Sequence, residues 1–312
     1  MLASDVPAWV VRAVALLFGA AWGSFFNVAI HRWPRGDSVV TPASRCPSCG
    51  TPVPAWRNVP ILAYVLLRGR AACCGARLSP RYVLVEALGA ALCVALAELH
   101  IVAAPAGTSA LDASLLALVY FAFTGALIVA TFVDLEWMEI PDEVSLPGAA
   151  LGLATAAMRP EPGPESAALG AGGGYLLVQL VLVWAYERLT GRRGMGEGDA
   201  KLLMMIGAFL GWKGALFALV LGAFQGLIVA LGFVAAGRSP TPTPPSYDDG
   251  STEPQEAEPT AGPEGEDGTR GTAEEPALLA TKMPYGPFLA LGAIEFLFFG
   301  EQILGWYLAL FE

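Results

Sequence analysis

Two aspartates lie where apolar stretches of the chain meet polar flanks. Asp134 follows a long apolar run, and Asp199 ends the sequence GEGD at 196–199. A carboxylate at membrane depth is costly and usually has a function. Two carboxyl groups on different helices can share a proton and activate a water molecule held between them. These residues therefore predict a membrane-embedded aspartic protease.

Hydrolysis by such a pair needs one ionised and one protonated carboxyl group. Asp199 begins a predicted helix, and a helix N-terminus favours negative charge, so we expect Asp199 to be the ionised member. Gly196 and Gly198 permit positive φ and let a substrate backbone approach closely. Two simpler interpretations stay open: Asp199 as a helix N-cap only, and Asp134 as a solvated residue at the end of a span.

Four further polar residues are candidates for supporting roles. Asn27 lies within the first apolar segment, where it either bonds across helices or positions substrate. Glu86, near the start of the second apolar segment, has the same two interpretations. Asp142 follows a proline and is expected to cap the short helix after it. Lys201 either extends toward the membrane interface or steadies Asp199.

The composition is that of a polytopic membrane protein. Of 312 residues, 55% are hydrophobic and 15% charged, with a mean hydropathy of +0.55. We expect an all-α polytopic fold with about eight transmembrane helices, because segments of about 20 apolar residues span a bilayer core. A core helix or re-entrant segment is the alternative for the two shortest segments. The segments are about 8–30, 83–104, 113–133, 143–158, 168–187, 199–212, 214–236 and 286–310.

Basic residues set the expected orientation, because they are enriched in cytoplasmic loops. Eight of the 18 lysines and arginines lie between the first two segments, and three more lie at 188, 192 and 193. Eight spans with both termini outside the cytoplasm place both groups inside. The same arrangement places Asp134 and Asp199 at the inner membrane face.

The net charge of −10 is concentrated in residues 238–282, which hold ten acids and three bases. This segment is also rich in proline, glycine, serine and threonine, so it cannot bury enough apolar surface to fold. We expect a disordered acidic cytoplasmic linker. Because most of the net negative charge lies in that linker, it gives no indication of nucleic-acid binding.

Residues 31–82 contain two pairs of cysteines. Cys46 and Cys49 form a CxxC turn, whereas Cys73 and Cys74 are adjacent. Four thiolates can hold a tetrahedral zinc ion, and a region of about 50 residues has too small a core to fold well without one. Adjacent cysteines are expected to reach one metal only with a strained backbone. Reduced thiols without metal are the alternative, since disulfides are rare in the cytosol.

The order of motifs resembles that of the type IV prepilin peptidases, bifunctional leader peptidase and N-methyltransferase enzymes. The resemblance covers nearly the whole chain except 238–282. The matching segments include GSFFNV at 23–28, RCPSC at 45–49, SPRY at 79–82, DLEWMEIPD at 134–142, GEGDAK at 196–201 and YGPFLA at 285–290.

The resemblance implies a multi-pass enzyme of the bacterial inner membrane with Asp134 and Asp199 as its catalytic pair. It implies cleavage of prepilin and pseudopilin leaders at the cytoplasmic face, followed by methylation of the new amino terminus with S-adenosylmethionine. The chain has no glycine-rich nucleotide fingerprint, so the sequence does not locate the S-adenosylmethionine site. Residues 31–82 and the flanking helices are the candidate region. The family carries two CxxC pairs, whereas Ala71 here occupies the expected third cysteine position. This departure puts the zinc geometry and the methylation in question.

The predicted division has five parts: a first transmembrane helix at 1–30, a cytoplasmic cysteine domain at 31–82, a peptidase core at 83–237, the linker at 238–282 and a last helix at 283–312. Three other functions stay open. They are a peptidase that has lost methylation, a transporter with the aspartates as a proton relay, and a scaffold with a zinc knuckle. A transporter places such carboxylates near the bilayer midplane, and a scaffold tolerates Asp199→Asn.

Overall fold

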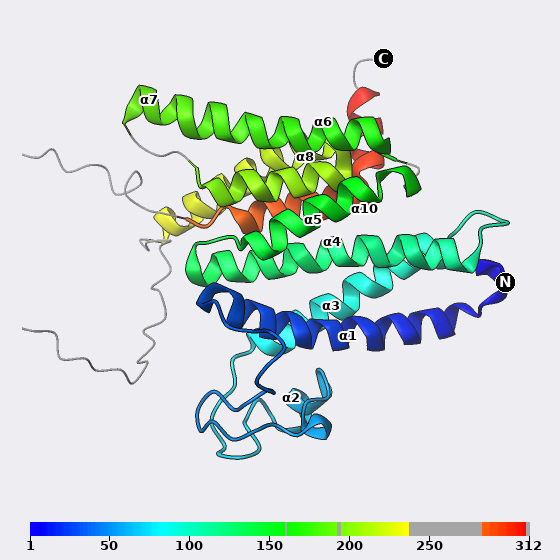
Figure 1. The fold of residues 1–312 in the computed structure, drawn as a ribbon, viewed down its shortest axis with the longest axis vertical. Helices are drawn as coiled ribbons and strands as arrows, with labels where there is room; N and C mark the ends of the chain where they lie inside the picture. The colour runs from blue at the N-terminus through cyan, green and yellow to red at the C-terminus, as the bar shows by residue number, and fades with distance from the viewer. Residues whose placement is uncertain (160, 192–194, 237–282, 310–312) are drawn as a thin grey trace, which may run out of the picture.

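The computed structural model describes residues 1–159, 161–191, 195–236 and 283–309, and this part of the chain is helical (Figure 1). Only isolated bridges, and no strands, occur among these residues. The helices are α1 (Ala8–Arg32), α2 (Leu62–Leu66), α3 (Arg81–Ala97), α4 (Ala110–Trp137), α5 (Asp142–Ala154), α6 (Gly163–Leu176), α7 (Tyr186–Thr190), α8 (Glu197–Ala235) and α10 (Gly286–Leu308). Two π-helical stretches, η4 (Glu98–Val102) and η6 (Leu177–Ala185), extend α3 and join α6 to α7.

The apolar helices confirm the all-α polytopic membrane fold. Five stretches of the described chain are long and apolar enough to cross a membrane: Ala8–Arg35, Arg81–Val102, Ala110–Trp137, Gly163–Thr190 and Glu197–Ala235. The count is below eight for two reasons. Two predicted segments fall within α8, and α5 has 13 residues. Helix α10 has 23 residues, and its apolar stretch Gly286–Gly300 lies within the predicted segment 286–310.

Helix α8 is interrupted at Gly211, where the backbone has φ 71° and ψ −177°. Such a positive φ strains residues with a Cβ, so glycine favours the break there. Before the break, Gly207 packs against Gly170 of α6; after it, Gly222 packs against Phe288 of α10. Both ends of α8 lie at the same end of the bundle in Figure 1. The two halves correspond to the predicted segments 199–212 and 214–236.

Arg159 contacts the backbone beside the break in α8. Its side chain is buried, and the guanidinium donates to the carbonyl oxygens of Gly152, Ala208 and Phe209. The last carbonyl groups of a helix have no partner within that helix. A single arginine therefore satisfies carbonyl groups near the ends of α5 and of the first half of α8.

Helix α4 occupies the middle of the bundle and contacts α1, α3, α5 and α10. Phe123, Leu127 and Val133 on this helix are fully buried. The ends that carry the candidate residues lie together: the C-terminus of α4, the start of α8 and the start of α10 share one end of the bundle (Figure 1). The bundle therefore brings three distant parts of the sequence to one place.

The loop region, residues 33–80, packs beside α1 and the start of α3 (Figure 1). It contains the short helix α2 and two turns, each closed by a bridge: Arg45 with Pro52, and Arg70 with Arg77. The predicted linker at 238–282 lies outside the described residues. The predicted domain boundaries stay predictions.

Candidate active site

The two aspartates line one cavity of about 510 Å³, although 65 positions separate them in the sequence. Asp134 lies in the last turn of α4, which ends because Met138 adopts a left-handed conformation with φ 54°. Asp199 lies in the first turn of α8. The exposed fractions of the two residues are only 5% and 9%. The other lining residues are Trp33, Pro34, Val133, Met138, Glu139, Ile140, Pro141, Asp142, Glu143, Gly196, Glu197, Gly198 and Lys201.

Each aspartate accepts a hydrogen bond from a glycine backbone. Gly286 N–H donates to Asp134 Oδ2 at 2.8 Å, and Gly196 N–H donates to Asp199 Oδ2 at 3.2 Å. A Cβ added at Gly286 would lie 2.8 Å from the same Asp134 oxygen. The sequence motif at 285–290 contains Gly286, yet nothing in that motif indicated a bond to Asp134. Gly198 packs against Ile140, where an added Cβ would lie 3.0 Å from the isoleucine Cβ.

Lys201 pairs with Asp142 and not with Asp199. Its Nζ lies 2.6 and 2.7 Å from the two carboxylate oxygens of Asp142. The expected cap role of Asp142 is wrong, because Pro141 holds the N-cap position and Asp142 is the first residue of α5. The side chains of Lys201 and Asp142 are 26% and 51% exposed, so the pair is worth about 0–1 kcal/mol.

Asn27 and Glu86 lie apart from the aspartates, on a second cavity of about 610 Å³. This second cavity is enclosed by the loop region, α1 and α3. Asn27 Nδ2 donates across to the carbonyl oxygen of Tyr82 at 3.0 Å, as one interpretation of the sequence expected. Glu86 Oε2 accepts a bond of 2.6 Å from the backbone N–H of Ile61.

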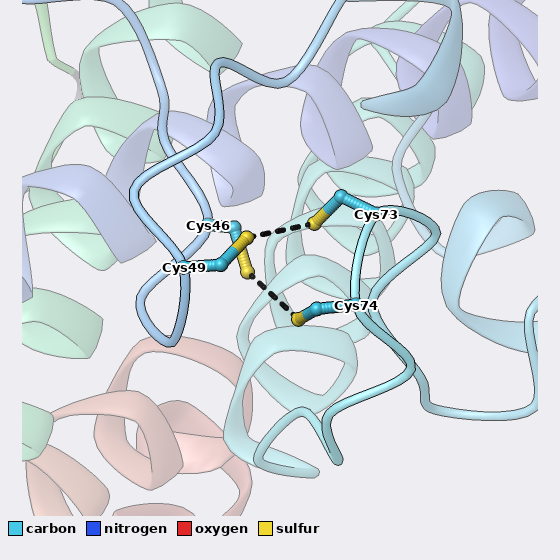
Figure 2. A group of neighbouring side chains, drawn as sticks. All are labelled: Cys46, Cys49, Cys73 and Cys74. Carbon is cyan, nitrogen blue, oxygen red and sulfur yellow. Dashed lines mark hydrogen bonds between the residues drawn. The ribbon is translucent and has the colours of Figure 1, made fainter.

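The four cysteines of the loop region converge on one point (Figure 2). All four Sγ atoms lie within 4.8 Å of one another. Cys46 Sγ is 3.8 Å from Cys74 Sγ, and Cys49 Sγ is 3.3 Å from Cys73 Sγ. Zinc–sulfur bonds of about 2.3 Å in a tetrahedron separate the sulfur atoms by about 3.8 Å. The cluster therefore fits a tetrahedral metal ion with four thiolate ligands.

The second cysteine turn repeats the backbone of the first. Cys46 N–H bonds to Thr51 O, and Gly50 N–H bonds to Cys46 O, both at 2.9 Å. The second turn has the equivalent two bonds, both at 2.8 Å. Ala71 N–H donates to Ala76 O, and Gly75 N–H donates to Ala71 O. Ala71 therefore occupies the place of Cys46, and Cys74 occupies that of Cys49.

Cys73 supplies the remaining thiol from a position between these two. The strained backbone expected at the adjacent cysteines is absent, so that expectation is wrong. The described non-glycine residues with positive φ are Ile61, Arg68 and Met138, and none of them is a cysteine. The left-handed residue of the second turn is Gly75, for which positive φ carries no steric cost.

The thiols of the cluster differ in acidity. The side chain and backbone of Thr51 lower the pKa of Cys49 to about 6. The contact with Cys49 raises the pKa of Cys73 to about 12. Because metals bind thiolates, the lowered pKa of Cys49 favours metal binding and the raised pKa of Cys73 opposes it.

Comparison with known proteins agrees with this layout. Residues 17–100 match the family model described as the bacterial peptidase A24 N-terminal domain, and residues 121–231 match that of the type IV leader peptidase family. A protein of Aeromonas hydrophila named prepilin leader peptidase/N-methyltransferase is 32% identical over 99% of this chain and 98% of its own length. The chain belongs to the type IV leader peptidase family.

Other relatives with the same name extend the comparison. A protein from Burkholderia pseudomallei strain K96243 is 30% identical over 95% of this chain and 87% of its own. One from Dichelobacter nodosus is 36% identical over 73% of this chain and 85% of its own. No solved structure matches the chain. This leader peptidase family member is a multi-pass inner-membrane protein, and the family region 121–231 contains both aspartates.

Proposed function

We propose that the chain is an intramembrane aspartic endopeptidase that removes the leader from type IV prepilins or pseudopilins and then methylates the new amino terminus. One observation carries the cleavage reaction. Two buried carboxyl groups, Asp134 and Asp199, line one cavity and each accepts a glycine N–H. The names of the relatives support the prepilin substrate and the second reaction.

The aspartate pair hydrolyses a peptide through a water molecule held between the carboxyl groups. The ionised carboxylate takes a proton as the water oxygen attacks the scissile carbonyl carbon, while the protonated carboxyl donates to the carbonyl oxygen. As the carbon–nitrogen bond then breaks, the carboxyl that gained a proton transfers it to the leaving amine. The other carboxylate takes back a proton from a hydroxyl of the tetrahedral intermediate, so that the carbonyl re-forms and the pair is restored. Neighbouring carboxyl groups titrate as a unit. The assignment of Asp199 as the ionised member stays a prediction.

The rim of the cavity suits a basic leader. Four further acids line it, Glu139, Asp142, Glu143 and Glu197, against the single base Lys201 among the described lining residues. A cleft lined by one sign of charge attracts ligands of the opposite sign. The C-terminus of α4 and the start of α8, which carry the two aspartates, lie at the end of the bundle from which the arginine-rich loop region leaves α1 (Figure 1). This position supports a cytoplasmic site.

The loop region supports the second activity. Cys46, Cys49, Cys73 and Cys74 would hold a structural zinc ion, which when bound cross-links the two turns that carry them. S-adenosylmethionine, when bound, supplies an electrophilic methyl group for transfer to an amine. The residues of this chain must therefore bind that cofactor close to the cavity in which the new amino terminus is released.

Cleavage of a prepilin by the purified full-length protein tests the aspartate pair. We expect Asp134→Asn and Asp199→Asn each to reduce the cleavage rate at least about 100-fold, because each removes a group that moves a proton. Asp112→Asn is the matched control, since this exposed aspartate lies in the first turn of α4, at the other end of that helix. Full activity in either of the first two variants would remove that residue from the pair, and full activity in both would overturn hydrolysis by this pair. Absence of cleavage by the unmodified protein would favour a scaffold.

A further inference from the structure

The second cavity, of about 610 Å³, has no role in the hydrolysis derived above. Its walls come from α1, α3 and the loop region, and they do not include Asp134 or Asp199. The cavity nevertheless adjoins the first. His31 and Arg32 line the second cavity, while the next two residues of the chain, Trp33 and Pro34, line the first. The two cavities therefore lie on either side of the same turn of chain.

A buried polar atom without a partner lies on this cavity. Asn27 is 4% exposed, and its Nδ2 donates to Gly23 O and Tyr82 O. Its Oδ1 is buried but accepts no hydrogen bond from the described residues. Buried polar groups in native proteins almost always have a partner, so this oxygen is available to accept a hydrogen bond from a bound molecule. A ligand in the cavity with an N–H or O–H group could therefore donate to Asn27 Oδ1.

A buried carboxylate lies on the same cavity and is held by a strained turn. Glu86 is 9% exposed and accepts its bond from the N–H of Ile61. Ile61 has φ 62° and ψ −52°, and Leu62 N–H bonds back to Pro60 O at 2.5 Å. A three-residue turn with positive φ is rare and strained for a branched side chain, and such strain concentrates at functional sites. The turn positions the backbone N–H that orients Glu86.

We infer that the second cavity binds S-adenosylmethionine, an inference that rests on the proposed methylation. This molecule carries a sulfonium and an ammonium cation, N–H donors, an aromatic base and a carboxylate. Glu86 matches the sulfonium cation and Asn27 Oδ1 matches an N–H donor, while Tyr64 and Tyr82 offer aromatic surfaces. Arg57 and Arg70, exposed side chains that also line the cavity, match the carboxylate. A pocket of this volume is within the range for ligands of that size.

The position explains how two reactions share one polypeptide. An amine produced in the first cavity needs only to pass the turn at 31–34 to reach the second. Asn27 and Glu86 are then positioning and binding residues for the methyl donor, and they take no part in hydrolysis.

Binding of radiolabelled S-adenosylmethionine to the full-length protein in detergent tests this assignment. We expect Asn27→Ala and Glu86→Gln each to weaken binding at least tenfold. Glu165→Gln, the same chemical change at an exposed glutamate of α6, should leave binding unchanged. S-adenosylhomocysteine lacks the sulfonium charge, so Glu86→Gln should weaken its binding less than that of S-adenosylmethionine. A merely structural role of Glu86 would weaken both equally.

Photochemical cross-linking of S-adenosylmethionine to the unmodified chain provides a second measurement that does not depend on the folding of variants. Attachment within residues 24–86 would support the site, and attachment elsewhere would overturn it. Wild-type binding in both variants would overturn the site and leave the proposed function intact. If the unmodified protein cleaves but neither binds nor uses S-adenosylmethionine, the methylation itself fails, and the inference fails with it.

Discussion

Ala71 occupies the position in the second cysteine turn that Cys46 occupies in the first. The cluster still has four sulfur atoms although this position is alanine, because Cys73, two residues later, places its sulfur 3.3 Å from that of Cys49. The metal geometry depends on where the four sulfur atoms lie, and the spacing of the cysteines in the sequence only constrains it indirectly. The residue-scale departure from the family pattern is therefore compatible with four thiolate ligands.

Replacement of one thiol should release the metal. We expect Cys46→Ser to lower bound zinc from about one ion per chain to a small fraction, because three thiolates leave the tetrahedral site incomplete. Methylation should fall more than proteolysis, since the aspartates lie on a different cavity. Elemental analysis of the purified protein measures the zinc. Cys93→Ala is the control, because Cys93 lies in α3 outside the cluster, and unchanged zinc in Cys46→Ser would contradict the site.

The ion pair between Lys201 and Asp142 should have a small effect. Both side chains are partly exposed, so a double-mutant cycle with Lys201→Gln and Asp142→Asn should give a coupling free energy below about 1 kcal/mol. Cleavage in Lys201→Gln should stay within about tenfold of wild type, because Lys201 does not pair with Asp199. A loss in Lys201→Gln as large as that in Asp199→Asn would instead make the lysine part of the catalytic machinery.

At the scale of elements, the contact between α1 and α3 depends on glycine. A Cβ added at Gly19 would lie 2.5 Å from Gly89 O, and one at Gly23 would lie 2.6 Å from Glu86 Cα. Membrane helices pack closely where small residues let their backbones approach. This contact also sets the wall of the second cavity that carries Asn27 and Glu86.

An added methyl group at this contact should destabilise the bundle. We expect Gly23→Ala to lower the free energy of unfolding by about 1–3 kcal/mol, because backbone atoms of α3 must move. Gly172→Ala is the matched control, since a Cβ at Gly172 of α6 meets nothing within 4 Å. That variant should be neutral or more stable by up to about 1 kcal/mol. Thermal unfolding in detergent measures the melting temperatures of the two variants. Equal melting temperatures would contradict a tight contact between α1 and α3 at Gly23.

At the scale of the whole molecule, the bundle places its chemistry at one end. The ends of α4, α8 and α10 that carry Asp134, Asp199 and Gly286 lie together, whereas the C-terminus of α5 and the loop before α4 lie at the other end (Figure 1). The basic residues of the loop region then decide which end faces the cytoplasm.

Site-specific labelling tests this orientation. Ala106 lies exposed in the loop before α4, and Val40 is 82% exposed in the loop region. We expect a membrane-impermeant maleimide to label Ala106→Cys in intact spheroplasts, and to label Val40→Cys only after lysis. Mass spectrometry identifies the labelled cysteine among the native ones. The reverse labelling pattern would mean that the chain has the opposite orientation, with the aspartates at the outer face of the membrane.

The sequence by itself determined the membrane helices and the residues to consider. Long apolar runs must form helices in a bilayer, because every backbone polar group there needs an internal partner. The local motifs around Asp134, Asp199 and Cys46 were likewise readable from neighbouring residues. The strain expected at Cys73 and Cys74 was not borne out, because the left-handed conformation falls on Gly75.

The tertiary structure alone decided which distant groups meet. Gly286 donates to Asp134 across 152 positions, and Lys201 selects Asp142 over the nearby Asp199. It also decided that Asn27 and Glu86 share a cavity separate from the aspartates. These contacts depend on how rigid helices pack against one another, and a local pattern of residue types carries no information about the atoms on the facing helix.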